Sequence, residues 1–200
     1  SEPYTNVNWY IYNNLIVSGN NASSLGGIVL NQPNGLMPQS IFMFNNTIIV
    51  NDDGSGLTTP IVNSGAVDTF VVKNNIVVMD APVNHVYNIR PMNPAGAYYR
   101  DIDYNAYYEY GGRVGNFSTG EGFASYTYDQ WQAGGYDLHS LAGNSTAVTF
   151  SNKFGLDLAD YYTETGRDLG LDLSSVYPSL VAKFPDIAYD ILGNPRTGAW

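Results

Sequence analysis

The positions of apolar and polar residues repeat along the first half of the chain. Each copy is a short alternating run, a pair of residues that ends in asparagine, and a second apolar run; the copies occupy residues 10–17, 42–49, 71–78 and 101–108. The asparagines that end the four pairs lie 32, 29 and 30 residues apart. A nearly constant period of this length is typical of solenoid proteins, in which each repeat is one structural unit.

Within each copy, the alternation is that of a β-strand, whose successive side chains point to opposite faces. One column is apolar in all four copies and is expected to face a core: Ile11, Met43, Val72 and Ile102. The next column becomes charged in its later members and is expected to face outward: Tyr12, Phe44, Lys73 and Asp103. Because β-branched residues are frequent in these runs, we predict strands rather than helices.

The strands of successive copies are too far apart in the sequence to pair as hairpins. They can pair in parallel if each copy forms one coil of a β-helix, with neighbouring coils about 4.8 Å apart. Equivalent asparagines would then stack at a bend and form a ladder of side-chain hydrogen bonds; the predicted ladder consists of Asn14, Asn46, Asn75 and Asn105. Ordinary asparagine turns in a β-sandwich are the alternative, and the regular spacing favours the ladder.

The pattern divides the chain into two parts. Short apolar runs at residues 27–30, 60–62 and 85–89 predict a third strand in each coil, and the repeat ends after Tyr108. We therefore predict an all-β protein with parallel β-helix coils over residues 1–110 and an irregular cap and lateral packing segment over residues 111–200. Within the second part, Thr127 and Gln130 form a capping box that predicts a short helix over residues 127–133.

The composition excludes some functions. The formal net charge is −10 and only 13% of the residues are charged, which argues against a nucleic-acid partner, because nucleic acid needs lysine and arginine. No apolar stretch is long enough for insertion into a membrane. Cysteine is absent, so the compartment is not indicated by disulfide chemistry.

The chain resembles the C-terminal part of right-handed parallel β-helix proteins of the broad pectate-lyase-like superfamily. The resemblance rests on the asparagine-pair coils and on five later stretches, at residues 103–108, 129–132, 135–141, 166–170 and 190–196. It implies a right-handed parallel β-helix and an extracellular, cell-surface or virion-surface location. Members of the superfamily include polysaccharide lyases, glycoside hydrolases, epimerases, tailspikes and proteins without catalysis, so the fold does not choose among these functions.

Four residues are candidates for catalysis, because lyases of this superfamily use a lysine or arginine base on the outer face: Lys73, Arg100, Asp101 and Asp103. Asp101 and Asp103 share one strand face, and paired carboxylates can also serve glycoside hydrolysis. The alternative is an ion pair that bridges two coils and has no catalytic role. His139 lies in the capping segment and is expected to be structural.

Aromatic residues form the candidate carbohydrate-binding surface. Tyr10 and Phe42 share one outward column, and Tyr12 and Phe44 share the other. Exposed rings in a row can stack on sugars or form a protein interface. The alternative is that the C-terminal segment folds over them.

Metal binding is weakly indicated. Residues 51–54 and the pair Asp168 and Asp172 carry the oxygen ligands that calcium accepts, but neither has the spacing of a calcium loop. No metal site and no cofactor are therefore predicted, although the sequence leaves calcium possible.

We expect an extracellular β-helix segment that binds or processes a polysaccharide. The alternative is a non-catalytic structural or adhesive module of a surface fibre, tailspike or filament. No segment before Trp9 is long and apolar enough to cover the coil that carries Asn14. We therefore expect this end to pair with upstream coils, a partner chain or a second copy of the chain.

Overall fold

The computed structural model places three parallel arrays of strands next to one another. It describes residues 8–18, 27–30, 40–50, 59–63, 67–79, 87–89, 99–108, 113–118, 123–143, 182–189 and 195. The repeats at residues 10–17, 42–49, 71–78 and 101–108 all lie within these ranges, so the predicted strand pairing can be compared directly with the structure.

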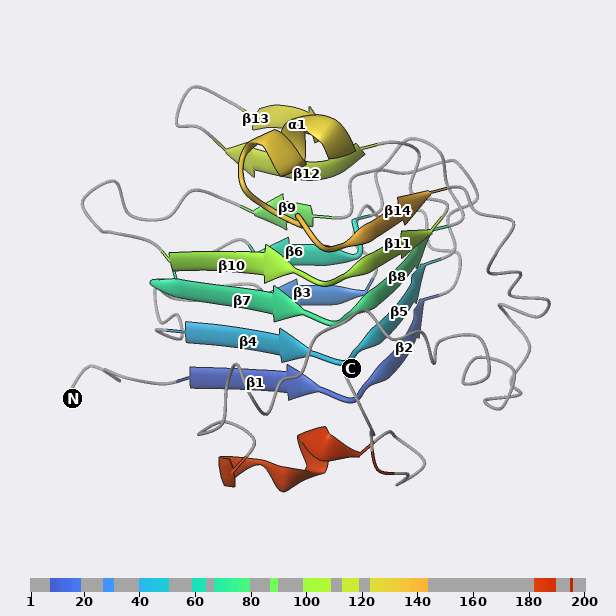
Figure 1. Ribbon diagram of the computed structural model, residues 1–200, viewed down its shortest axis with the longest axis vertical. Helices are drawn as coiled ribbons and strands as arrows, with labels where there is room; N and C mark the ends of the chain where they lie inside the picture. Colours follow the sequence, from blue (N-terminus) through green and yellow to red (C-terminus); the bar gives the residue numbers. More distant parts are fainter. Residues whose placement is uncertain are drawn as a thin grey trace.

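Each sheet takes one strand from each repeat (Figure 1). The first sheet has the order β1 (Asn8–Tyr12), β4 (Ser40–Phe44), β7 (Thr69–Lys73), β10 (Tyr99–Asp103). The second has the order β2 (Leu15–Ser18), β5 (Thr47–Val50), β8 (Ile76–Met79), β11 (Ala106–Tyr108), β14 (Leu141–Gly143). The third has the order β3 (Ile28–Leu30), β6 (Ile61–Asn63), β9 (Tyr87–Ile89), β12 (Arg113–Ser118), β13 (Phe123–Thr127).

The strand pairs follow the register of the repeat. Strands of successive repeats are parallel, and Tyr10 pairs with Phe42, which in turn pairs with Val71. The pairing of β12 with β13 is antiparallel. The part of the chain that the structure describes is therefore mostly strand, arranged in largely parallel sheets, as the predicted all-β class requires. The boundary at residue 110 stays a prediction, although β12 and β14 lie beyond it and extend two of the sheets.

A two-residue bend joins the first and second strands of each repeat. The first residue of each bend has a positive φ, of 55° at Asn13, 55° at Asn45, 56° at Asn74 and 56° at Tyr104. This left-handed conformation favours asparagine, which explains the first member of three of the four pairs. The second member of each pair is the ladder asparagine, and its side chain makes the contacts between repeats.

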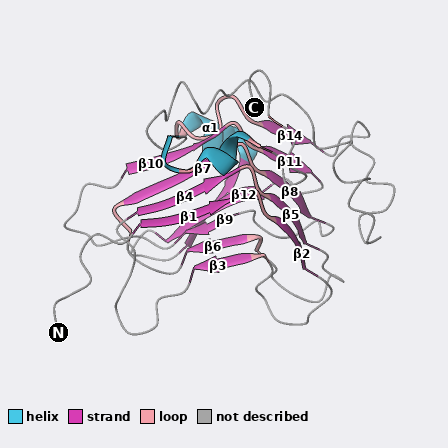
Figure 2. Cartoon of the chain, turned by 90° about the horizontal axis from the view of Figure 1, so that it is seen from below, coloured by secondary structure: helices cyan, strands magenta, loops and turns pink. Residues whose placement is uncertain are grey.

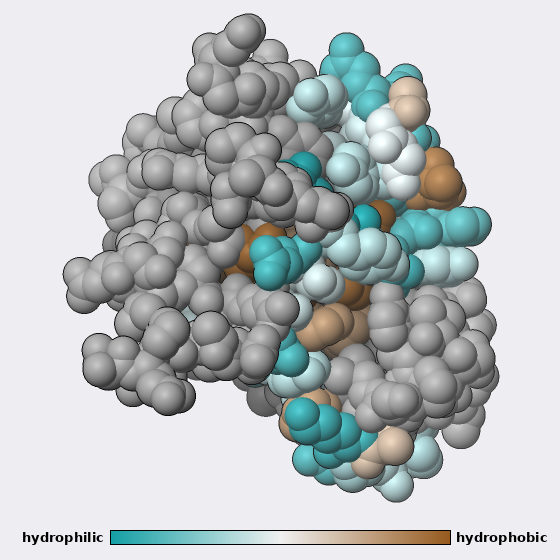
Figure 3. Space-filling view, turned by 90° about the vertical axis from the view of Figure 1, so that its left-hand side faces the viewer, coloured by the Kyte–Doolittle hydropathy of each residue, from teal (hydrophilic) through white to brown (hydrophobic). Residues whose placement is uncertain are grey.

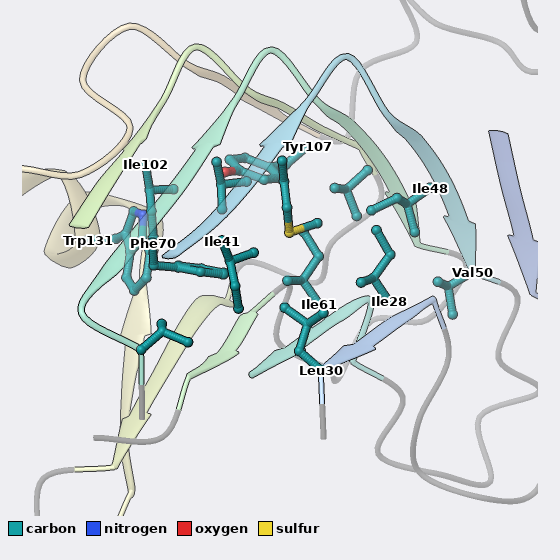
Figure 4. Packing of buried hydrophobic residues seen from close by; sticks show 14 residues of the cluster. Ile28, Leu30, Ile41, Ile48, Val50, Ile61, Phe70, Ile102, Tyr107 and Trp131 are labelled. Atoms are coloured by element: carbon teal, nitrogen blue, oxygen red, sulfur yellow. The ribbon is translucent and has the colours of Figure 1, made fainter. Parts of the chain in front are cut away.

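The core lies between the sheets (Figure 4). Met43, Val72 and Ile102 are buried and belong to the core cluster, as the inner column predicts. Phe70 and Ile41, which lie on the same face of their strands, point into the same cluster. The alternation of the strands therefore places one face of the first sheet in the core.

The outer column is less exposed than the sequence predicts. Phe44 is 0% exposed and Lys73 is 7% exposed, so both side chains are buried although they lie on the face of the sheet opposite the core residues Met43 and Val72. The parallel register places Phe44 between Tyr12 and Lys73, so that side chains of adjacent strands cover one another along the column. Tyr12 and Asp103, at the two ends of the column, keep partial exposure.

The C-terminal part closes the stack at the β10 end. Helix α1 (Tyr128–Ala133) has the capping box that the sequence predicts, with Thr127 as N-cap and Gln130 at the third helical position. Trp131 of α1 is buried in the core cluster. Helix α1 contacts β12 and β13 of the third sheet, and the view from below shows it at the end of the stack of strands (Figure 2). Strand β14 then pairs with β11.

A second C-terminal segment, residues 182–189, lies at the opposite end, next to β1 (Figure 1). It contains the 3-10 helix Pro185–Ala188. A segment of the C-terminal part of the chain therefore meets this end of the stack. Among the described helices, none is long and apolar enough to cross a membrane.

Candidate functional site

Charged side chains gather on the outer face of the first sheet at its β10 end. The Nζ of Lys73 lies 2.7 Å from Oδ1 of Asp101, and both side chains are largely buried. The hydroxyl of Tyr99 donates to Oδ2 of the same carboxylate at 3.2 Å. Burial and the neighbouring Asp101 carboxylate raise the pKa of the Tyr99 phenol above its ordinary value. The ion pair therefore joins Lys73 of one repeat to Asp101 of the next. The residue opposite Lys73 in the strand register is Asp103, which does not form this pair.

The second carboxylate, Asp103, holds the loop that follows α1. Its Oδ1 accepts hydrogen bonds from the backbone N–H of Tyr104 at 2.9 Å and of His139 at 2.8 Å. The Nδ1 of His139 lies 2.7 Å from Oδ2 of Asp103, the geometry of an Nδ1–H that donates to the carboxylate. The imidazole ring also stacks on Tyr104, with centroids 4.7 Å apart and an interplanar angle of 10°.

These contacts fix one edge and one face of the His139 ring, while its side chain stays 59% exposed. Lys73 approaches the ring of Tyr104, with its Nζ 5.6 Å from the ring centroid. The site is therefore a connected row of polar and aromatic groups. Its members are Tyr99, Asp101, Lys73, Tyr104, His139 and Asp103.

Arg100 does not belong to this row. It pairs in register with Phe70, which pairs with Ile41, and both of those residues lie in the core. Because neighbouring strand residues alternate between faces, Arg100 lies on the opposite face of β10 from Asp101 and Asp103. Of the four residues predicted to be catalytic, the structure brings together Lys73, Asp101 and Asp103.

The predicted aromatic surface lies at the other end of the same sheet. Tyr10 and Phe42 are stacked, with centroids 5.1 Å apart and an interplanar angle of 8°. Phe184 of the C-terminal segment lies 4.6 Å from Tyr10 and 6.0 Å from Tyr12. Phe44 is fully buried. For Tyr10 and Tyr12, the structure therefore has the alternative arrangement, in which the C-terminal segment folds over the rings.

The four predicted ladder asparagines are joined by side-chain hydrogen bonds. The Nδ2 group of Asn14 donates to Oδ1 of Asn46 at 2.9 Å, Asn46 donates to Asn75 at 2.8 Å, and Asn75 donates to Asn105 at 3.1 Å. Each accepting oxygen also receives the backbone N–H of the same donor residue, at 2.9–3.2 Å. The ladder runs inside the stack, since Asn46, Asn75 and Asn105 are all buried.

The ladder ends on a pair of residues that the sequence reasoning missed, Asp137 and Ser140. The Nδ2 group of Asn105 donates to Oδ1 of Asp137 at 3.1 Å, and its backbone N–H donates to the Ser140 hydroxyl at 2.7 Å. Ser140 in turn donates to the same carboxylate oxygen at 2.6 Å. The two side chains together replace the single amide oxygen of a further asparagine.

Asp137 is fully buried and accepts two further hydrogen bonds on its other oxygen. The Tyr107 hydroxyl donates to Oδ2 at 2.8 Å and the Trp131 indole N–H donates to it at 2.6 Å. Burial raises the pKa of the Asp137 carboxyl above its ordinary value, although the four donated hydrogen bonds act in the opposite direction. Asp137 also has a φ of 51°, like the first residue of each bend.

A signal for Ser140 was present in the sequence. Ser140 directly precedes the apolar residue Leu141, as Asn105 precedes Ala106, and Leu141 pairs with Ala106 in the structure. The role of Asp137 had no such signal, because it lies three residues earlier and serves the ladder through a turn.

Several candidates lie outside the described residues: residues 51–54, Asp168 and Asp172. Within the described part of the chain, no group of three or more histidine, cysteine, aspartate or glutamate side chains is placed to hold a metal ion. The possibility of calcium at the other positions therefore stays a prediction.

The exposed large apolar side chains of the described residues are Trp9, Val29, Tyr99, Leu138 and Tyr189. On the face in Figure 3, hydrophobic groups appear as small areas among hydrophilic ones. Among these five residues, Tyr99 stands out because its hydroxyl donates a hydrogen bond to Asp101.

Comparisons with known proteins give no family model, no curated protein and no solved structure that matches this chain. The functional argument therefore rests on the site itself.

Proposed function

We propose that the chain is a segment of a right-handed parallel β-helix that binds polysaccharide at an extracellular, cell or virion surface. The order of strands supports the β-helix, because every repeat contributes one strand to each of the three sheets in the same sequence. The polysaccharide would bind on the outer face of the first sheet, at the β10 end.

One observation carries the choice of this surface: the exposed rings of Tyr99 and His139 lie in one row with the carboxylates of Asp101 and Asp103. Aromatic rings offer an apolar face to a sugar ring, and carboxylate oxygens accept hydrogen bonds from sugar hydroxyls. Lys73 and the loop around His139 hold these groups in place before a ligand arrives, which lowers the entropy cost of binding.

The charge of the chain indicates the kind of polysaccharide. A net charge of −10 repels polyanions at long range. The row itself contains two carboxylates, Asp101 and Asp103, but one ammonium group, Lys73, which pairs with Asp101. The proposed ligand is therefore a neutral or amino-sugar polysaccharide and not a polyuronate.

The contacts of the row favour binding over turnover at this face. Lys73 is held at 2.7 Å by Asp101, so its ammonium group serves as an ion-pair partner and not as a base that meets a sugar. Asp103 already accepts three contacts, from Tyr104 and His139. Glycoside hydrolysis needs two carboxyl groups that face the same glycosidic bond, and these two are both engaged by protein groups.

The proposal is tested by measuring the affinity of the chain for neutral, amino-sugar and uronate oligosaccharides by calorimetry. Tyr99→Ala and His139→Ala are each expected to weaken binding of the preferred oligosaccharide roughly fivefold, because each removes one stacking surface. Tyr189→Ala, which removes another exposed tyrosine at the opposite end, is the matched control and should leave the affinity unchanged. Equal binding by all four proteins would contradict the proposed surface.

The second candidate is a non-catalytic structural or adhesive module, and the burial of the Lys73–Asp101 pair favours it. Breaking a buried pair by removal of one partner leaves an uncompensated charge. Asp101→Asn is expected to lower the free energy of unfolding by about 2 kcal/mol, less than for a fully buried pair because Asp101 is 21% exposed.

Denaturant unfolding of Asp101→Asn, Lys73→Met and the double variant measures this contribution. In the double variant most of the loss should be recovered, because no charge is then buried alone. Single and double variants that all unfold like the wild type would show that the pair does not stabilise the stack.

A further inference from the structure

The β1 end of the stack is covered in a way that imitates another repeat. β1, β2 and β3 are the end strands of their sheets among the described residues. The C-terminal segment 182–189 lies against β1 at this end (Figure 1). Its contacts repeat two of the contacts that one repeat makes with the next.

The first repeated contact is the ring column on the outer face. Tyr10 of β1 stacks on Phe42 of β4 on one side. On the other side, Phe184 lies 4.6 Å from the Tyr10 ring, and Lys183 places its Nζ 5.4 Å from the Tyr10 centroid and 5.2 Å from that of Phe184. Phe184 therefore covers Tyr10 where the ring of a preceding repeat would lie, with its ring tilted by 47° and not stacked as in the Tyr10–Phe42 pair.

The second repeated contact involves the first residue of the bend. In the stack, the Nδ2 group of Asn74 donates to Oδ1 of Asn45, one repeat below, at 2.7 Å. The Nδ2 group of Asn13 instead donates to the backbone oxygens of Asp186 at 2.7 Å and Tyr189 at 2.8 Å. Two carbonyls of the C-terminal segment thus substitute for an asparagine side chain.

Residues 182–189 do not reproduce the contacts of the asparagine ladder. The Oδ1 atoms of Asn46, Asn75 and Asn105 each accept two N–H groups from the ladder asparagine one repeat below. No N–H group of the described residues donates to Oδ1 of Asn14, and Asn14 is exposed. This end consequently retains an acceptor for the backbone N–H and side-chain amide of one further asparagine.

We propose that the surface formed by β1, its bend and β2 is a docking site for one additional strand–bend–strand layer, and that residues 182–189 compete with this layer. The partner is defined by the chemistry of the stack: a ring four residues before a ladder asparagine, a left-handed asparagine directly before that ladder residue, and an apolar strand after it. This proposal is independent of the polysaccharide ligand.

A peptide from the chain itself provides the probe. Residues 40–50 contain the strand, bend and strand of the second repeat, and lysines added at both ends with a fluorophore keep the peptide soluble. The matched control peptide carries Asn46→Leu, which keeps the size of the side chain but removes the amide that would meet Asn14. Fluorescence anisotropy measures the binding of each peptide to the full chain.

Two variants open the end without altering β1 or β2. Phe184→Ala removes the competing ring, and Lys183→Ala keeps that ring but removes the side chain whose ammonium group lies over Tyr10 and Phe184. We expect Phe184→Ala to raise the affinity for the matched peptide about tenfold, because a larger fraction of the chain is then competent to bind. Lys183→Ala should give a smaller increase in the same direction, and the control peptide should bind each protein at least about fivefold more weakly.

Three results would overturn the proposal. The first is an unchanged affinity for the matched peptide in both variants, which would show that the segment does not compete. The second is equal binding of the matched and control peptides, which would remove the role of Asn14. The third is dimerisation of Phe184→Ala in sedimentation that excess matched peptide suppresses, which would make a second copy of the chain the occupant of this surface.

Discussion

Replacing Asp137 by alanine is expected to lower the free energy of unfolding by about 3–5 kcal/mol, because a buried hydrogen-bond network then loses its shared acceptor. The carboxylate accepts hydrogen bonds from four donors, and all of them are left without it: Asn105, Tyr107, Trp131 and Ser140. Each buried donor left unsatisfied costs about 1–3 kcal/mol, and the cavity adds to this loss.

Asp137→Asn separates the hydrogen-bond pattern from the size of the side chain. The asparagine keeps one acceptor oxygen for Asn105 and Ser140, but its amide group then faces the Tyr107 hydroxyl and the Trp131 N–H. A loss of about 2 kcal/mol is expected, because the Trp131 N–H is left without an acceptor. Asp129→Asn, an exposed carboxylate on α1, removes the same charge and should change stability by less than about 0.5 kcal/mol. Urea unfolding of the three variants measures the differences, and equal midpoints for Asp137→Asn and Asp129→Asn would contradict this role.

The pH dependence gives the same network a second readout. Because burial raises the pKa of the Asp137 carboxyl, the folded state holds that proton at a higher pH than the unfolded state does. Its contribution to stability is therefore fully present below the ordinary aspartate pKa of about 3.9 and is lost as the pH rises through the folded value. Asp137→Asn should lack this component, whereas Asp129→Asn should retain it.

The repeating parts of the fold could be predicted from the sequence. The spacing of Asn14, Asn46, Asn75 and Asn105 predicts parallel strands, because side chains at one bend can meet only if each repeat advances by one strand spacing. The Thr127 and Gln130 capping box predicts α1 for a local reason, since both of its hydrogen bonds lie within four residues. In both cases the pattern that carries the information is short or periodic.

The contacts at the two ends of the stack could not be predicted in this way. Asp137 and Ser140 end the ladder through contacts with Asn105, which lies 32 and 35 residues away. Phe184 meets Tyr10 from the opposite end of the chain. Such contacts occur once, so no periodicity marks them. The burial of Lys73 was missed for a related reason, because its cover comes from the ring of Tyr104 and from Asp101 on the neighbouring repeat.

The candidate site and the end of the ladder share one loop. Residues 137–140 carry Asp137 and Ser140 inside the stack and His139 on its surface. The Asp103 carboxylate receives both the backbone N–H and the imidazole of His139. The position of the exposed imidazole is therefore set by the same loop that terminates the ladder, and the stability of the ladder also bears on the geometry of the site.

The ladder itself is tested by Asn75→Leu, which is expected to lower the free energy of unfolding by about 2–4 kcal/mol. Asn75 is fully buried, its Nδ2 group donates to Asn105, Met43 and Lys73, and its Oδ1 accepts two N–H groups of Asn46. Leucine fills the same space but leaves the Asn46 backbone N–H unsatisfied, at a cost of about 1–3 kcal/mol, with further losses at the carbonyls.

Asn14→Leu is the matched control, because Asn14 makes the same kind of bond to Asn46 at the exposed end of the ladder. Water can replace the bonds lost there, so the expected loss is about 1 kcal/mol or less. Denaturant unfolding of both variants, with circular dichroism to verify the sheet content, gives the comparison. If Asn75→Leu unfolds at the wild-type midpoint, or no earlier than Asn14→Leu, the asparagines do not hold the repeats together and the stack depends on its apolar core alone.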